Sequence, residues 1–226
     1  MTLRDQLDAC KAQLLEVLDP ADREALEAAI DRLRMLQIVE HGPAVGDLLP
    51  EFALPDADGR LVTSETLLER GPLVLAFFRG PWCPYCSMAL QALNQARPAI
   101  EALGASLVTV APLPPGELRE MAAERGLGLT LLSDRDGRYA RICGLGFEMS
   151  DGGKALYQRL AARFGASIPR LAPDRAWELP IPATFVAGRD GVIGFAFGDA
   201  DWARRAEPAE IVAAVRQLAQ AATTAG

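Results

Sequence analysis

Residues 73–90 read Leu-Val-Leu-Ala-Phe-Phe-Arg-Gly-Pro-Trp-Cys-Pro-Tyr-Cys-Ser-Met-Ala-Leu, and this stretch decides the fold. Its apolar start, Leu73 to Phe78, contains no polar residue and is typical of a buried strand in a parallel sheet. Apolar residues at helical spacing between Ser87 and Leu103 predict a helix. The motif Trp-Cys-Pro-Tyr-Cys therefore lies where a buried strand ends and a helix begins.

The two cysteines of this motif, Cys83 and Cys86, are three residues apart at the start of the predicted helix. This spacing places them on one face of the first turn, close enough to form a disulfide. A helix N-terminus favours negative charge and lowers the pKa of a thiol there. An ordinary thiol, with a pKa of about 8.5, is only roughly 3% thiolate at pH 7, so a modest lowering creates a nucleophile. The exposed start of the helix and the flanking Trp82 and Tyr85 favour a redox dithiol over a pair of buried structural thiols.

The bulk composition excludes several classes of function. The chain has 226 residues, half of them apolar, and a net charge of −7, which argues against binding nucleic acid or an anionic membrane surface. The start shows no signal-peptide pattern, and no apolar run approaches the roughly 18 residues of a transmembrane helix. We therefore expect a cytoplasmic protein, a compartment in which disulfides are usually transient or catalytic.

Neither a metal nor another cofactor is expected. A zinc site would need two ligands besides the dithiol, and the chain offers one histidine, His41, and two isolated cysteines. Cys10 lies on an apolar helical stripe and Cys143 at the end of a predicted short helix, so we expect both in the core.

An N-terminal helical hairpin precedes one larger domain. Apolar residues recur at helical spacing on both sides of Asp19-Pro20, a cap and first-turn proline. Residues 1–42 therefore form a hairpin, which packs either on its own domain or on a second copy in a homodimer.

Residues 43–226 alternate strands and helices. This order predicts an α/β fold with parallel strands joined by right-handed crossovers. Two later segments, 183–186 and 192–197, flank Arg189-Asp190-Gly191 and predict an antiparallel hairpin. Residues 144–178 are rich in glycine and proline, which indicates an insertion that covers the site.

Together these elements resemble the thioredoxin fold, and within it the peroxiredoxin-like branch of the alkyl hydroperoxide reductase and thiol-specific antioxidant (AhpC/TSA) family. The resemblance covers roughly residues 45–197. Its markers are Val-Gly-Asp at 45–47, Pro-Glu-Phe at 50–52, Phe-Phe-Arg-Gly at 77–80, Leu-Ser-Asp at 132–134 and Pro-Ala-Thr-Phe at 182–185. The Cys-Pro-Tyr-Cys dithiol is similar to that of glutaredoxins. The resemblance implies a mixed central sheet flanked by helices.

The motif departs from the usual peroxiredoxin pattern. When Cys86 is aligned with the peroxide-attacking cysteine, Arg79 takes the place of the usual proline and Cys83 that of the usual hydroxyl. The arginine that completes the family's peroxide site falls near Pro182, which instead matches the cis-proline that faces the dithiol of thioredoxins. We therefore expect a cis bond before Pro182.

The resemblance implies a thiol-dependent peroxidase that reduces hydroperoxides and is recycled by a thioredoxin- or glutathione-type reductant. We assign Cys86, Cys83 and Arg79 to catalysis. Cys86 attacks the peroxide and becomes a sulfenic acid, and Cys83 resolves that sulfenic acid by forming a disulfide with it. Substrate contacts are expected from residues 82, 85 and 182. Two alternatives stay open, namely a thiol–disulfide oxidoreductase with Cys83 as the nucleophile, and a redox-regulated binding protein.

Overall fold

A five-stranded mixed sheet forms the centre of the computed structural model, which describes residues 1–164 and 177–224. Its strands follow the order β5-β4-β3-β8-β9. They are β3 (Leu73–Phe77), β4 (Ser106–Ala111), β5 (Thr130–Ser133), β8 (Ala183–Ala187) and β9 (Ile193–Gly198).

The central strand β3 is buried along its whole length, as its uninterrupted apolar sequence predicts. It pairs in parallel with β4, which pairs in parallel with β5. On its other side β3 pairs antiparallel with β8, and β8 and β9 form the predicted antiparallel hairpin. The expected mixed sheet flanked by helices is therefore confirmed.

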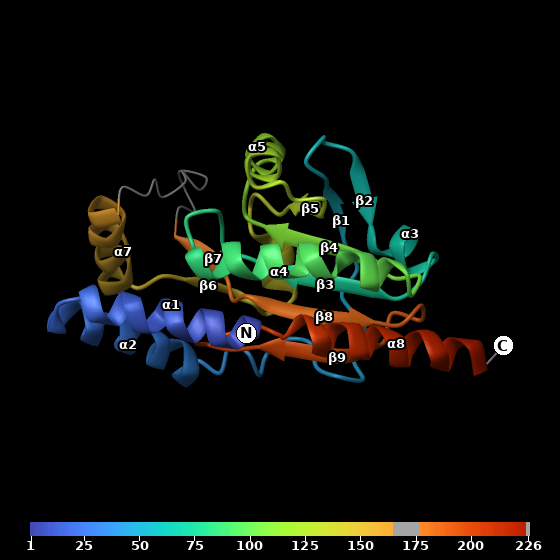
Figure 1. Ribbon diagram of the computed structural model, residues 1–226, viewed down its shortest axis with the longest axis horizontal. Coiled ribbons are helices and arrows are strands. Elements are labelled where there is room, and N and C mark those ends of the chain that lie inside the picture. Colours follow the sequence, from blue (N-terminus) through green and yellow to red (C-terminus); the bar gives the residue numbers. More distant parts are fainter. Residues whose placement is uncertain (165–176, 225–226) are drawn as a thin grey trace.

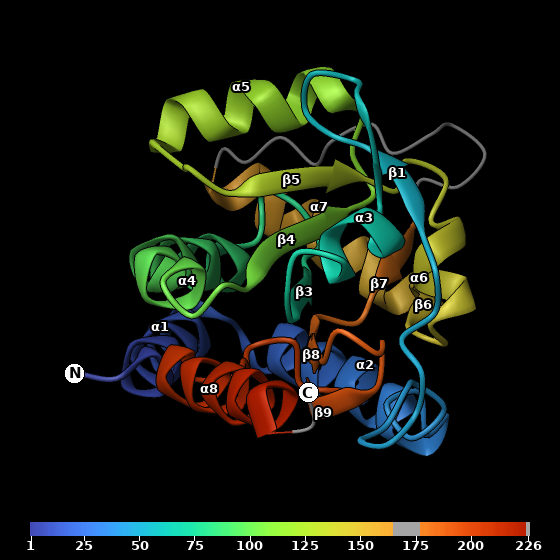
Figure 2. The ribbon, with the colours of Figure 1, turned by 90° about the vertical axis from the view of Figure 1, so that its right-hand side faces the viewer.

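Helices cover both faces of the sheet (Figure 2). On one face α4 (Pro84–Glu101) packs against α8 (Pro208–Thr224), with α1 (Leu3–Val17) beside α4. The helix α6 (Arg138–Ile142) lies on the other side of the sheet, and α5 (Pro115–Arg125) packs against the edge strand β5. A small hairpin, β1 (Ala53–Pro55) and β2 (Leu61–Thr63), leads into α3 (Ser64–Leu68).

The N-terminal hairpin packs on its own domain. It consists of α1 and α2 (Pro20–Met35), and Asp19 caps α2 as predicted. Leu7 of α1 is 2% exposed, and the carboxylate of Glu207 accepts hydrogen bonds from the backbone N–H groups of residues 3 and 4. Lys11 forms an ion pair with Asp201. Of the two arrangements the sequence allows, the intramolecular one is therefore realised.

The predicted insertion contains one helix, α7 (Asp151–Phe164), between β6 (Gly146–Glu148) and β7 (Glu178–Pro180). β6 and β7 pair antiparallel, and α7 packs against α2, where Arg159 forms an ion pair with Asp22. Residues 165–176 of the insertion lie outside the described residues. In Figure 1, α7 and one end of α1 lie at the same end of the molecule as the start of α4.

The topology brings a distant loop to the start of α4. Because β9 runs antiparallel to β8, and β8 antiparallel to β3, the strands β3 and β9 end at the same edge of the sheet. Residues 199–207, between β9 and α8, therefore meet the dithiol motif, which follows β3 directly. None of the helices in the described part of the chain is long and apolar enough to cross a membrane.

Candidate active site

Both cysteines of the motif are free thiols and both are buried. Cys83 is the N-cap of α4 in an extended conformation, and Cys86 lies in the first turn; they are 2% and 0% exposed. The expectation of an exposed helix start is therefore wrong. The physical reason is that α1, α7 and residues 199–207 cover this end of α4, and all three lie far from the motif in the sequence.

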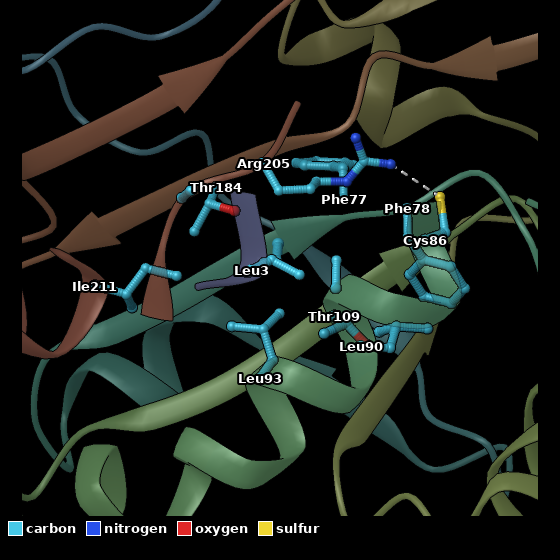
Figure 3. A pocket seen from close by; sticks show the side chains of 13 residues that line it. Leu3, Phe77, Phe78, Cys86, Leu90, Leu93, Thr109, Thr184, Arg205 and Ile211 are labelled. Carbon is cyan, nitrogen blue, oxygen red and sulfur yellow. Dashed lines mark hydrogen bonds between the residues drawn. The ribbon is translucent and has the colours of Figure 1, made fainter. Parts of the chain in front are cut away.

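The sulfur of Cys86 is surrounded by hydrogen-bond donors. The guanidinium Nη2 of Arg205 lies 3.2 Å from Cys86 Sγ (Figure 3), and the backbone N–H of Arg79 donates to the same sulfur at 3.4 Å. Burial alone would raise the pKa of the Cys86 thiol. The hydrogen bond from Cys83, the charge of Arg205 and the Arg79 N–H outweigh burial and hold that pKa well below its ordinary value.

Cys83 has the opposite character. Its thiol donates the hydrogen bond to Cys86, and this bond together with burial raises the pKa of Cys83 well above its ordinary value. The two shifts have opposite directions and favour a negative charge on Cys86 and a proton on Cys83. In thiol chemistry the thiolate is the nucleophile, and the Arg205 and Arg79 N–H groups that stabilise a thiolate lie at Cys86.

Arg79 is fully buried inside a cage of three aromatic rings. Its guanidinium carbon lies 4.9 Å from the ring centroid of Trp82 and 5.0 Å from those of Tyr157 and Trp202. Among the described residues its Nε, Nη1 and Nη2 atoms have no hydrogen-bond partner. Burial favours a neutral group, but the nearby Tyr157 and the two cysteines raise the pKa of Arg79, so it stays a cation. The cage thus holds a fixed positive charge next to the dithiol.

The cage depends on a glycine before the motif. Gly80 has φ +153°, and a Cβ at this position would lie 2.5 Å from Nε1 of Trp82. A side chain here would force Trp82 away from Arg79, so only glycine permits the ring to fold back over the guanidinium.

Arg205 is a site residue that the sequence analysis missed. Its Nη1 donates to the backbone carbonyls of Trp202 and Arg204, which fixes the guanidinium beside Cys86. Asp201 orders the same loop, because its carboxylate accepts from the N–H of Ala203 at 3.1 Å and pairs with Lys11. The sequence feature that could have pointed to Arg205 was the predicted hairpin of β8 and β9, because the loop that follows it returns to the edge of the sheet where the motif lies.

Two spaces of very different size adjoin the dithiol. The first, near Cys86, has a volume of about 20 Å³. Arg205, Thr184 and Thr109 contribute to its wall, and the hydroxyl of Thr109 has no hydrogen-bond partner among the described residues. A cavity of this size holds one or two water-sized groups.

The second space, which we call the chamber, has a volume of about 610 Å³ and borders Cys83 instead of Cys86. Its wall is made by α1, Leu26 of α2, α7, Trp202 and the motif itself, including Trp82 and Tyr85. Cys10, which was expected in the core, is half-buried and lines this chamber as well. Cys143 is fully buried away from it, and burial raises its pKa to about 12.

Pro182 does not have the expected conformation. No cis peptide bond occurs among the described residues, so the bond before Pro182 is trans and the thioredoxin-like expectation is wrong. The N–H of Ile181 donates to Leu145 O at 2.8 Å, which keeps the chain extended from β7 into β8. An extended path needs no cis bond, and the trans form is favoured by about 0.5–1 kcal/mol. Pro182 is buried and lines neither space.

Comparison with known proteins places this geometry in context. A sequence profile described as the AhpC/TSA family matches residues 45–196, more than half of the chain. The methylamine utilization protein MauD of Paracoccus denitrificans is 33% identical over 91 residues, which are 40% of this chain and 44% of MauD. Peroxiredoxin Bcp of Escherichia coli (strain K12) is 29% identical over 109 residues, which are 48% of this chain and 69% of Bcp.

A solved structure supports the fold. The crystal structure of peroxidoxin BcpB from Mycobacterium tuberculosis matches with a TM-score of 0.58 and 21% identity, covering 77% of this chain and 97% of that one. The match to MauD spans less than half of MauD's length. The dithiol, Arg79 and Pro182 lie inside the region matched by the profile, whereas Arg205, Trp202 and α1 lie outside it.

Proposed function

Since the chain belongs to the AhpC/TSA family, we propose that it is a thiol peroxidase in which Cys86 attacks the hydroperoxide and Cys83 resolves the product. The observation that carries this proposal is that the Cys86 sulfur accepts hydrogen bonds from Arg205 at 3.2 Å and from the Arg79 N–H at 3.4 Å. These contacts lower the pKa of Cys86 and favour its thiolate, while burial and the hydrogen bond to Cys86 raise the pKa of Cys83.

In the first step the Cys86 thiolate attacks the distal oxygen of the hydroperoxide. An S–O bond forms, the O–O bond breaks, and the alkoxide or hydroxide that leaves takes up a proton. Cys86 becomes a sulfenic acid. Arg205 stands beside the reacting sulfur and supplies N–H groups for the charge that develops on the peroxide oxygens.

In the second step the sulfur of Cys83 attacks the sulfenic sulfur of Cys86. The disulfide forms, the S–OH bond breaks, and the hydroxide leaves as water with the proton that Cys83 gives up. The hydrogen bond between the two thiols brings the sulfurs together in the reduced protein. An external thiol then returns the disulfide to two thiols.

The size of the cavity beside Cys86 bears on the substrate. About 20 Å³ accepts the two oxygens of a hydroperoxide but no alkyl chain. We therefore propose hydrogen peroxide as the substrate that the reduced protein accepts most readily.

A second candidate, a thiol–disulfide oxidoreductase with Cys83 as the nucleophile, is favoured by one observation. Cys83 borders the chamber, and Cys86 does not. In this reaction a substrate disulfide enters the chamber and is attacked by Cys83.

Serine variants decide between the two candidates. Each variant is treated with peroxide and a sulfenic-acid trap, and the modified residue is found by mass spectrometry. Cys83→Ser should trap sulfenic acid at Cys86, and Cys86→Ser should be nearly unreactive. Cys143→Ser is the matched control, because Cys143 is buried elsewhere, and it should behave as the wild type. Trapping at Cys83 instead would assign the nucleophile to Cys83 and favour the oxidoreductase.

A further inference from the structure

The chamber is closed on several sides by elements that are fixed to one another. Ion pairs join Lys11 of α1 to Asp201 and Arg159 of α7 to Asp22 of α2. Cys83, at the inner wall, is only 2% exposed. A protein thiol must bring its own sulfur into line with a disulfide, so the burial of Cys83 favours a small thiol that can enter the chamber.

The side chains that line the chamber disfavour a charged reductant. Of the residues that the structure describes, those lining the chamber include no charged side chain; the main contributors are leucine, valine, proline and aromatic residues. A volume of about 610 Å³ falls in the range of small-molecule sites. Glutathione carries two carboxylates and an ammonium group. Burying these in an apolar chamber of a chain with net charge −7 is unfavourable.

The two sulfurs of the disulfide are not equivalent as targets. An incoming thiolate that attacks Cys83 expels Cys86, whose thiolate is stabilised by Arg205 and the Arg79 N–H. Exchange is faster when the leaving thiol has the lower pKa. Access through the chamber and the stability of the leaving group therefore favour the same point of attack.

We propose, on the basis of the peroxidase function above, that the chamber binds the recycling reductant and that this reductant is a small, uncharged dithiol with an apolar body. Its first thiolate attacks Cys83, the Cys83–Cys86 bond breaks, and Cys86 leaves as a thiolate. The second thiol of the reductant then attacks the reductant's first sulfur, which is bonded to Cys83 in the mixed disulfide. Cys83 is released and takes a proton, and the reductant leaves as a cyclic disulfide, so two electrons pass to the protein.

A dithiol can complete the reduction of Cys83 from one binding event, whereas a monothiol cannot. The second attack occurs within one bound molecule, so no second molecule has to reach the mixed disulfide at Cys83.

The test measures the two half-reactions separately on the full chain. Hydrogen peroxide oxidises the protein, and mass spectrometry follows the loss of two hydrogens. The isolated disulfide protein is then mixed, without peroxide, with dihydrolipoamide, dihydrolipoate, glutathione or a thioredoxin, and free thiols are alkylated at set times. We expect dihydrolipoamide to react at least about tenfold faster than glutathione and thioredoxin, and faster than dihydrolipoate, which differs from it by one carboxylate.

A pair of variants on α7 locates the reaction in the chamber. Leu160→Glu introduces a charge into the wall, whereas Gln158→Glu introduces the same charge on an exposed position of the same helix. Leu160→Glu should slow reduction by dihydrolipoamide about tenfold, and Gln158→Glu should react as the wild type. Oxidation is measured on both, because a folding defect lowers both half-reactions while a reductant-site defect lowers one.

The outcomes separate the two proposals. Reduction by thioredoxin or glutathione as fast as by dihydrolipoamide, or an equal effect of the two variants, overturns the chamber as the reductant site. If peroxide forms no disulfide, the peroxidase function fails. The disulfide is then made with diamide, and the same series of reductants still decides the question of the chamber.

Discussion

Removing the guanidinium of Arg205 should weaken the thiolate of Cys86. Arg205 Nη2 lies 3.2 Å from Cys86 Sγ in a buried setting. A hydrogen bond to a charged group contributes about 1.5–3 kcal/mol, so its loss in Arg205→Met should raise the pKa of Cys86 by about 1–2 units. The methionine fills much of the same apolar space, which limits the effect on packing.

The assay is a pH titration of thiolate absorbance near 240 nm, together with the second-order rate of reaction with hydrogen peroxide. The matched control is Arg204→Met. The neighbouring Arg204 has a side chain that is 56% exposed, pairs with Asp199 and makes no contact with Cys86. A more basic thiolate is intrinsically more nucleophilic, so the titration midpoint is the decisive reading and the rate is secondary. An unchanged midpoint in Arg205→Met, or an equal shift in Arg204→Met, would refute the assigned role.

Three further predictions follow from the same geometry. The rate at which the wild type reacts with hydrogen peroxide should stay constant through neutral pH and fall only as the pH drops through the lowered pKa of Cys86, because the thiolate is the reactive form. Stopped-flow measurements across pH would contradict this if the rate fell near the ordinary thiol pKa of about 8.5. Arg79→Met should raise the pKa of Cys86, which the thiolate titration measures. The free energy of unfolding, measured by urea denaturation, should change by less than about 2 kcal/mol, because losing the contacts with the rings destabilises the protein while removing a buried cation without hydrogen bonds to the described residues stabilises it. Leu7→Ala should lower the free energy of unfolding by about 2–5 kcal/mol. Val17 lies on the same helix and is 42% exposed, so Val17→Ala should lower the free energy of unfolding by less than about 0.5 kcal/mol. Equal urea midpoints for the two variants would show that α1 does not pack as described.

The sequence predicted what depends on local pattern. The apolar run from Leu73, the motif and the following helix lie next to one another, so their spacing alone indicates a buried strand that leads into a dithiol. The antiparallel hairpin at residues 183–198 was also readable from sequence, because its turn residues, 189–191, and the two apolar segments that flank them are close in the chain. The alternation of strands and helices predicted an α/β fold, and the resemblance to the thioredoxin fold supplied the mixed central sheet.

The surroundings of the site were not readable, because they come from segments that only tertiary structure joins. The rings around Arg79 belong to the motif, to α7 and to the loop after β9, so its cage has no local signature. The burial of Cys83 depends on α1, more than 60 residues earlier. The cis expectation at Pro182 rested on sequence position and took no account of the hydrogen bond that keeps the chain extended there.

The placement of the chamber also bears on how proteins of this kind diverge. Cys10, Gln13, Leu14 and Val17 contribute to its wall from α1, outside the segment shared with the family, while both sulfurs lie inside that segment. Substitutions in the first helix can therefore alter which molecule fits without displacing the atoms that carry out the chemistry. One part of the chamber wall can therefore vary in a helix that contributes no atom to the dithiol itself.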